Sequence, residues 1–314
     1  MRILLLGSGG QVGHELRRSL ALLGDVVALD HPQVDLADPR GLPPIVRSAS
    51  PDVIVNAAAY TAVDRAEQEP DVAHAVNATS VGVLADEALG RGALLVHFST
   101  DYVYPGVGEQ PWTETDATAP VNAYGRSKLA GDVAIAQSGC RHVILRTSWV
   151  YASRGTNFVR TILRLARERD HLRVVDDQFG VPTSASFLAD VAARVIDRHM
   201  GGRSGRGVEG GGVSGGGRSG GGAGVYHAVP GGVTTWFGVA GAVLERARLR
   251  GFVPRLSDGG LMPCTTAEYP LPAARPMNSR LDTARLRRDF GLQCGDWRDD
   301  LHRVVDELME GAST

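Results

Sequence analysis

The sequence predicts an α/β fold in which a doubly wound parallel sheet over residues 1–150 precedes a smaller, mainly helical lobe over residues 151–314. In the first half, short apolar runs alternate with longer amphipathic segments. The runs are continuously apolar, which is typical of strands that are buried on both faces by flanking helices. The expected strands cover residues 3–6, 26–29, 53–55, 94–98 and 143–145.

The second half shows a weaker alternation of the same kind. One further strand is expected at residues 225–229, and helices are expected at residues 157–169, 187–198, 235–248 and 296–310. Between them, 14 of the 24 residues in segment 201–224 are glycine. Glycine at that density cannot offset its ordering entropy, so we expect a flexible surface insert, with a mobile lid as the alternative.

Composition excludes several classes of protein. The 314 residues are 43% hydrophobic and 22% charged, with a formal net charge of −2, which argues against a nucleic acid or an anionic membrane as the main partner. No apolar run approaches the roughly 20 residues of a membrane span. The three cysteines have no metal-like spacing, so we expect neither disulfides nor a metal, and a cytoplasmic location.

A glycine-rich turn follows the first expected strand directly. Gly7, Gly10 and Gly13 are spaced so that the chain turns sharply, exposes backbone N–H groups and then packs a helix closely on the sheet. A pyrophosphate would sit at that helix N-terminus, contacted also by Gln11 and Val12. The pattern predicts a Rossmann-type domain that binds a dinucleotide.

Acidic and small residues extend this predicted cofactor site. Asp30 ends the second strand, where a carboxylate would bind the adenosine ribose and repel a 2′-phosphate, which favours NADH over NADPH. Asp35 and Leu36 could meet the adenine, although Asp35 is equally well explained as a solvated loop acid. After the third strand, small residues leave room for a ligand, and the predicted contacts are Ala59, Tyr60 and Thr61.

A single lysine stands out among the 33 basic residues, because the other 32 are arginine. Lys128 lies four residues after Tyr124, so the two side chains share one helix face. A nearby ammonium would lower the pKa of the phenol and make Tyr124 a usable acid or base. Thr100 ends the fourth strand beside them, but the residues alone do not favour it over Ser99.

These segments carry a resemblance to a known family. The chain is identified as a member of the extended short-chain dehydrogenase/reductases, and within them it resembles the dTDP-4-dehydrorhamnose reductases. The matching segments begin at the residue given: GSGGQVG at 7, NAAAYTAVDRAE at 56, NATSV at 77, HFSTDYVYPG at 97, ETDATAPVNAYGRSKLAGD at 114, LRTSWVYA at 145, DDQFGVPT at 176 and RPMNSRLD at 275.

The resemblance implies a reaction and roles for residues. NADH or NADPH would reduce the 4-keto group of dTDP-4-dehydro-6-deoxy-L-mannose (dTDP-6-deoxy-L-lyxo-4-hexulose) to dTDP-L-rhamnose. Tyr124 would protonate the nascent alkoxide, Lys128 would lower the Tyr124 pKa and hold the nicotinamide ribose, and Thr100 would bind the keto oxygen. It also implies sugar-nucleotide contacts, for Asp101, Tyr102, Trp149 and Arg275. For Asp101 and Tyr102 a structural role is an equal alternative, and Trp149 could instead be a core aromatic.

One departure from the family concerns metal and assembly. Glu15 matches the first glutamate of a Mg²⁺ site that some members form at a dimer contact, but the other aligned positions hold Ser186 and Ala284. A hard cation needs several oxygen ligands. We therefore expect no metal, with Glu15 as an ordinary first-turn acid, and a monomer or weak homodimer.

Two alternative functions share the same fold. A sugar-nucleotide epimerase or dehydratase would keep the Tyr124–Lys128 pair, but a dehydratase needs an Asp-Glu pair after its threonine, and here Asp101 precedes Tyr102. A non-catalytic regulatory subunit is the other alternative, although the retained catalytic residues argue against it. Fold alone does not separate these functions.

Overall fold

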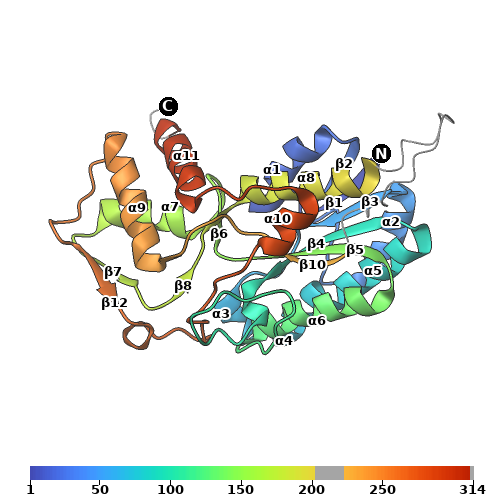
Figure 1. The fold of residues 1–314 in the computed structure, drawn as a ribbon, viewed down its shortest axis with the longest axis horizontal. Helices are drawn as coiled ribbons and strands as arrows, with labels where there is room; N and C mark the ends of the chain where they lie inside the picture. Colours follow the sequence, from blue (N-terminus) through green and yellow to red (C-terminus); the bar gives the residue numbers. More distant parts are fainter. Residues whose placement is uncertain (202–222, 312–314) are drawn as a thin grey trace.

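The computed structural model describes residues 1–201 and 223–311, so the predicted glycine-rich insert lies almost entirely outside the described residues. Six parallel strands form the central sheet in the order β10-β5-β4-β3-β1-β2 (Figure 1). Every strand predicted from an apolar run is confirmed. The bounds are Arg2–Leu6 for β1, Asp25–Leu29 for β2, Val53–Asn56 for β3, Leu94–Thr100 for β4, Arg141–Thr147 for β5 and Gly224–His227 for β10.

Helices cover both faces of the sheet, as Figure 1 shows. One face carries α1 (Gln11–Ala21), α8 (Ala185–Met200) and α10 (Ala284–Phe290), and the other carries α2 (Leu42–Ala49), α5 (Ser80–Arg91) and α6 (Ala123–Ser138). Successive strand residues enter opposite cores, since Leu5 packs toward α1 and Leu6 toward α2. This two-sided burial explains why the strands are continuously apolar, and it confirms the predicted α/β class.

The chain returns to the sheet after residue 150, so the predicted boundary between the lobes needs a correction. Helix α8 packs along α1, and β10 pairs with the outer edge of β5. Both elements satisfy groups that the first lobe leaves open: the apolar face of α1 and the unpaired backbone edge of β5. The sheet lobe is therefore assembled from two separate stretches of the chain.

The second lobe packs three helices over short strand pairs. Helices α7 (Phe158–Glu168), α9 (Trp236–Leu249) and α11 (Trp297–Glu310) share a core around Trp297. They begin where side-chain caps occur, at Asn157, Thr235 and Asp296, which is why their predicted bounds hold. The strand pairs are β7 (Leu172–Val175) with β12 (Leu261–Cys264), β8 (Phe179–Gly180) with β11 (Thr234–Thr235), and β6 (Val150–Tyr151) with β9 (Thr183–Ser184).

Several short elements connect the larger ones. They are α3 (Val63–Ala66), α4 (Pro70–His74), the π-helical turn Ala75–Thr79 and the 3-10 turns Pro39–Gly41, Asp101–Val103 and Thr266–Glu268. Runs of this length carry no hydrophobic period, so the sequence did not predict them. Among the helices that the structure describes, none has the length and apolar character needed to cross a membrane.

Helix α6 lies unusually close to the π-helical turn. A Cβ atom built on Gly131 would lie 2.1 Å from the carbonyl oxygen of Asn77, so only glycine permits this approach. At the other end, the Asn122 side chain caps α6 by accepting a hydrogen bond from the Gly125 N–H at 2.7 Å. Together these contacts set the position of the helix that carries Tyr124 and Lys128.

We expect Gly131→Ala to destabilise the fold by about 1 to 3 kcal/mol, because the added methyl overpacks a contact with backbone. Gly90→Ala is the matched control, since Gly90 also lies in a helix and a Cβ there meets nothing within 4 Å. Urea unfolding monitored by circular dichroism measures both. Equal free energies of unfolding for the two variants would contradict the role of Gly131.

Candidate active site

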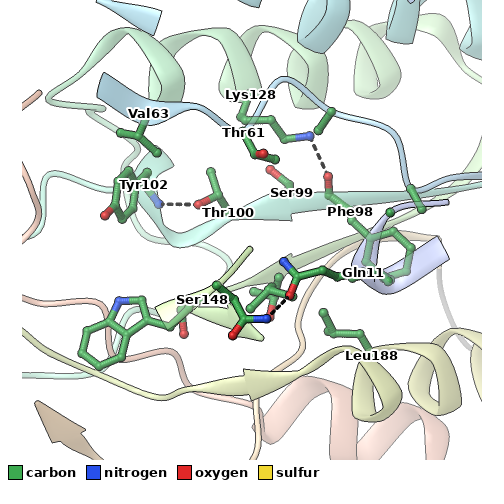
Figure 2. A pocket seen from close by; sticks show the side chains of 18 of the residues that line it. Gln11, Thr61, Val63, Phe98, Ser99, Thr100, Tyr102, Lys128, Ser148 and Leu188 are labelled. Atoms are coloured by element: carbon green, nitrogen blue, oxygen red, sulfur yellow. Dashed lines mark hydrogen bonds between the residues drawn. The ribbon is translucent and has the colours of Figure 1, made fainter. Parts of the chain in front are cut away.

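A cavity of about 550 Å³ opens at the carboxyl ends of the parallel strands. Its walls come from the loops after β1, β3, β4 and β5, together with residues of α6, α8 and α9. Strand order reverses between β1 and β3, and a crevice at such a reversal is where open α/β sheets bind ligands. Figure 2 shows residues from the sheet lobe on both sides of this cavity.

The glycine turn has the close approaches that its spacing predicts. Gly7 has a φ of +79°, and a Cβ atom there would lie 2.5 Å from the Ala58 nitrogen. A Cβ atom on Gly13 would lie 1.9 Å from the Gly7 carbonyl oxygen. Gly10 precedes α1 without a side-chain cap, so the N-terminus of α1 faces the cavity with Gly10, Gln11 and Val12 in its wall. This geometry fits the diphosphate of a dinucleotide.

Asp30 lies beside this turn at the end of β2 and lines the cavity. A Cβ atom on Gly9 would lie 2.0 Å from an Asp30 carboxylate oxygen, so glycine is what lets the acid stand here. The other Asp30 oxygen accepts a hydrogen bond from the His31 N–H at 3.0 Å. The carboxylate is thus held at the place where an adenosine ribose would bind.

The structure does not bring every predicted cofactor contact to the cavity wall. Leu36 is only 6% exposed and packs in the core beneath the sheet, while the Asp35 carboxylate accepts a hydrogen bond from the Ala37 N–H at 2.8 Å. Ala59 and Thr61 line the cavity. Tyr60, between them, turns its hydroxyl away and donates to Glu69 at 2.9 Å.

Tyr124, Lys128 and Thr100 line the cavity together. The Lys128 side chain is 1% exposed, and its Nζ donates to the Phe98 carbonyl at 2.7 Å (Figure 2). The Thr100 hydroxyl oxygen accepts from the Tyr102 N–H at 3.2 Å and donates to an Asp101 carboxylate oxygen at 3.1 Å. Because Thr100 ends β4 while the other two occupy one face of α6, the sheet edge and the helix meet at this point.

Burial is the largest influence on the pKa values of Lys128 and Tyr124. Burial lowers the pKa of Lys128 to about 8, with the negative charge of Asp132 acting against it. The pKa of Tyr124 is raised by burial and by the charge of Asp101, and a hydrogen bond between the Tyr124 and Thr100 side chains opposes this rise. The expected lowering of the Tyr124 pKa by Lys128 was therefore wrong for the protein alone. Tyr124 carries its proton, as a proton donor must.

Asp101 and Tyr102 line the cavity next to Thr100. Asp101 is 3% exposed, and burial raises the pKa of its carboxyl group to about 7. The Tyr102 ring meets the Tyr124 ring edge to face, with centroids 5.9 Å apart. Both residues line the cavity, so packing against Tyr124 and contact with a ligand are compatible roles.

An aromatic pair closes the far side of the cavity. Trp149 adopts a φ of +50°, which is rare for a bulky side chain, and its ring stacks on Trp236 with centroids 4.0 Å apart. Gly180 makes room for the Trp149 ring, since a Cβ atom there would approach it to 2.8 Å. Trp236 begins α9 and was missed by the sequence analysis, because nothing local distinguishes it from a core aromatic.

Arg275 stands apart from the other predicted contacts. Its guanidinium donates to the Asp64 carboxylate at 2.8 Å and to the Ala273 carbonyl at 2.9 Å. Among the residues described, the cavity wall does not include it. The sequence analysis also overlooked Asn157, which lines the cavity and donates to the Gln11 side chain at 2.9 Å.

Glu15 lies outside this cavity, in a smaller hollow of about 340 Å³ that also contains Ser186, Arg303 and Glu307. Over residues 1–201 and 223–311, no three His, Cys, Asp or Glu side chains cluster in a way that could hold a metal ion. The absence of a bound metal stays a prediction.

Comparison with known proteins agrees with this geometry. The family model described as "RmlD substrate binding domain" matches residues 1–310. The dTDP-4-dehydrorhamnose reductases of Escherichia coli and Burkholderia thailandensis are 46% and 45% identical to the chain, covering 98% of it and 98% and 99% of their own lengths.

Solved structures extend the similarity to the whole fold. A dTDP-4-dehydrorhamnose reductase from Clostridium acetobutylicum has a TM-score of 0.85 at 32% identity, covering 98% of this chain and 99% of that one. Another, from Bacillus anthracis in complex with NADP, has a TM-score of 0.84 at 31% identity, with the same coverage of both chains. The chain therefore belongs to the RmlD family, the family of the dTDP-4-dehydrorhamnose reductases.

Proposed function

We propose that this protein uses a reduced nicotinamide cofactor to convert the 4-keto group of dTDP-4-dehydro-6-deoxy-L-mannose into the alcohol of dTDP-L-rhamnose. The observation that carries the proposal is the convergence of Tyr124, Lys128 and Thr100 on one cavity beside the Gly7–Gly13 turn. The names of relatives that are 46% identical over nearly the whole chain support the choice of substrate.

Residues of the sheet lobe would hold the cofactor. The N–H groups at the start of α1 would bind the diphosphate, Asp30 the adenosine ribose and Lys128 the nicotinamide ribose. The close approaches at Gly7 and Gly13 pack this turn against the loop after β3 and bring the start of α1 up to the end of β1. When bound, the cofactor supplies the hydride that reduces the keto carbon.

The protein's own residues would manage the proton. Tyr124 donates its phenolic proton to the substrate oxygen, and the Thr100 hydroxyl hydrogen-bonds the same oxygen as negative charge develops there. The raised pKa of Tyr124 keeps the proton in place until it is needed. Asp101, Tyr102 and Trp149 would position the sugar, whereas Arg275 would first have to leave Asp64 to meet a diphosphate.

The setting of the enzyme is also a proposal. We infer a cytoplasmic location, because Cys140, Cys264 and Cys294 are all free thiols in the structure. We further propose a monomer or weak homodimer whose partner is the dTDP-sugar alone, with no nucleic acid or membrane surface involved.

Incubation of the purified protein with reduced cofactor and the dTDP-4-keto sugar tests the activity. We expect reduced-cofactor absorbance to fall only when that sugar is present. Conversion of another sugar nucleotide without net loss of reduced cofactor would indicate an epimerase or a dehydratase, because these reactions return the hydride to the sugar. Cofactor binding with neither oxidation nor sugar conversion under any condition would indicate a regulatory subunit.

Tyr124→Phe should lower kcat by at least about 100-fold, because it removes the proton donor. The Kd for reduced cofactor, measured by fluorescence titration, should stay near the wild-type value. Tyr60→Phe is the matched control, because the Tyr60 hydroxyl points toward Glu69. This variant should have the kcat of the wild type. Wild-type turnover by Tyr124→Phe would remove Tyr124 from the acid role.

Asp30→Asn should shift cofactor preference toward NADPH by about tenfold in the ratio of kcat/KM values, equivalent to about 1.4 kcal/mol, because a neutral amide no longer repels a 2′-phosphate. Steady-state kinetics with both cofactors measure the ratio. Asp35→Asn serves as the control, because the Asp35 carboxylate already accepts a hydrogen bond from the Ala37 N–H. An unchanged ratio for Asp30→Asn would place the ribose-binding acid elsewhere.

A further inference from the structure

A row of three buried polar side chains runs behind the cavity. Strands β3 and β4 pair Asn56 directly with His97, and the Asn56 Nδ2 lies 3.2 Å from the His97 Nδ1. On the other side of the ring, the His97 Nε2 lies 3.0 Å from the Lys128 Nζ. Each of the three side chains is at most 1% exposed. The catalytic roles proposed above make no use of Asn56 or His97.

The backbone fixes which way the Asn56 amide points. Its Oδ1 accepts a hydrogen bond from the Ala58 N–H at 3.2 Å, so its nitrogen is the atom that faces His97. An amide nitrogen can only donate, and a neutral imidazole accepts at one nitrogen and donates at the other. The His97 Nδ1 must therefore accept, which leaves the ring proton on Nε2, directed at Lys128.

This proton arrangement constrains Lys128. An ammonium group has three donors and no acceptor. It cannot accept the proton on the His97 Nε2, so two donors would face each other across this contact. A neutral amine satisfies every contact, because it donates to the Phe98 carbonyl and accepts the Nε2 proton on its lone pair. If Lys128 is protonated, the His97 ring proton must move from Nε2 to Nδ1. The Asn56 amide must then turn its oxygen toward Nδ1, and it loses the hydrogen bond from the Ala58 N–H.

The surrounding charges do not remove this conflict. Asp132 on α6 favours the ammonium, but its carboxylate is also paired with Arg146 on β5 at 3.0 Å. Burial and the Lys128 charge hold the pKa of His97 well below its ordinary value, so this ring stays neutral and can only exchange one tautomer for the other. Asn56 is the uncharged group that faces the ring from β3.

We propose that Asn56 and His97 form a proton switch in which the charge of Lys128 is coupled to the tautomer of His97. When Lys128 gains a proton on Nζ, His97 gains one on Nδ1 and releases one from Nε2, so its own charge does not change. His97 and Asn56 are thus positioning residues that make Lys128 a reversible proton carrier. The catalytic meaning rests on the proposed reductase function, whereas the contacts and the test below do not.

The lone lysine makes this proposal directly measurable. Because Lys128 is the one lysine among 314 residues, lysine labelled with ¹³C at Cε gives a single side-chain NMR signal from the full chain. We expect that signal to titrate near pH 8. In the same pH range, the ¹⁵N signals of His97 should show the ring proton moving from Nε2 to Nδ1 as pH falls. A lysine midpoint near the ordinary value of about 10.4, or an unchanged His97 tautomer, would overturn the switch.

His97→Gln separates the tautomer from simple burial. A glutamine oxygen accepts from both Asn56 and an ammonium without any rearrangement, so the Lys128 midpoint should rise by about one pH unit or more. His142→Gln is the control, because His142 lies on the neighbouring strand β5 and contacts the Cys140 carbonyl instead. Its midpoint should equal that of the wild type.

Asn56→Asp provides a second, isosteric variant in case His97→Gln does not fold. A carboxylate only accepts, so it demands the proton on Nδ1 of His97 and leaves Nε2 free to accept from the ammonium. The Lys128 midpoint should again rise, with His97 held as one tautomer across the whole titration. If the midpoint stays at the wild-type value in whichever of these two variants folds, the proposal fails whatever the enzyme's activity.

Discussion

A hydrogen bond from the Lys128 Nζ to the Phe98 carbonyl joins helix α6 to the carboxyl end of β4. The geometry of the candidate active site depends on this hydrogen bond. A buried lysine needs several partners to offset its desolvation, and the end of β4 supplies two of them. Tyr124 lies one helical turn earlier, so its position beside Thr100 follows from this anchor. The Gly131 contact with Asn77 makes the approach of α6 possible.

The cavity is completed by parts of the chain that are distant in sequence. Trp149 after β5 stacks on Trp236 of the second lobe, and the positive φ of Trp149 directs its ring there. Helix α8 and strand β10 return to the sheet lobe, so the two lobes share several chain crossings rather than one. The chain therefore connects the cavity wall that contains Trp149 and Trp236 to the wall that contains the glycine turn at several points.

Local patterns predicted most of the fold and the centre of the site. Apolar runs located all six sheet strands, and the weaker alternation of the second half located the helices of the second lobe, which the structure shows beginning at side-chain caps. The glycine spacing and the Tyr124–Lys128 interval are also local features, so both can be recognised without three-dimensional information. The short strand pairs were missed, because pairing between two-residue strands depends on distant partners. For the same reason, the sequence could not indicate that Tyr60 turns toward Glu69 or that Arg275 is engaged by Asp64.

Periodicity and short-range spacing encode the sheet, the glycine turn and the tyrosine–lysine pair directly, so these features can be read from the sequence. Proton affinities and the set of residues that line the cavity depend on how distant elements pack together. Burial reversed the expected direction of the Tyr124 pKa, and register between β3 and β4 brought Asn56 against His97 and so beside Lys128. Desolvation and hydrogen-bond direction depend on atoms from separate elements, so they exist only once the chain has folded.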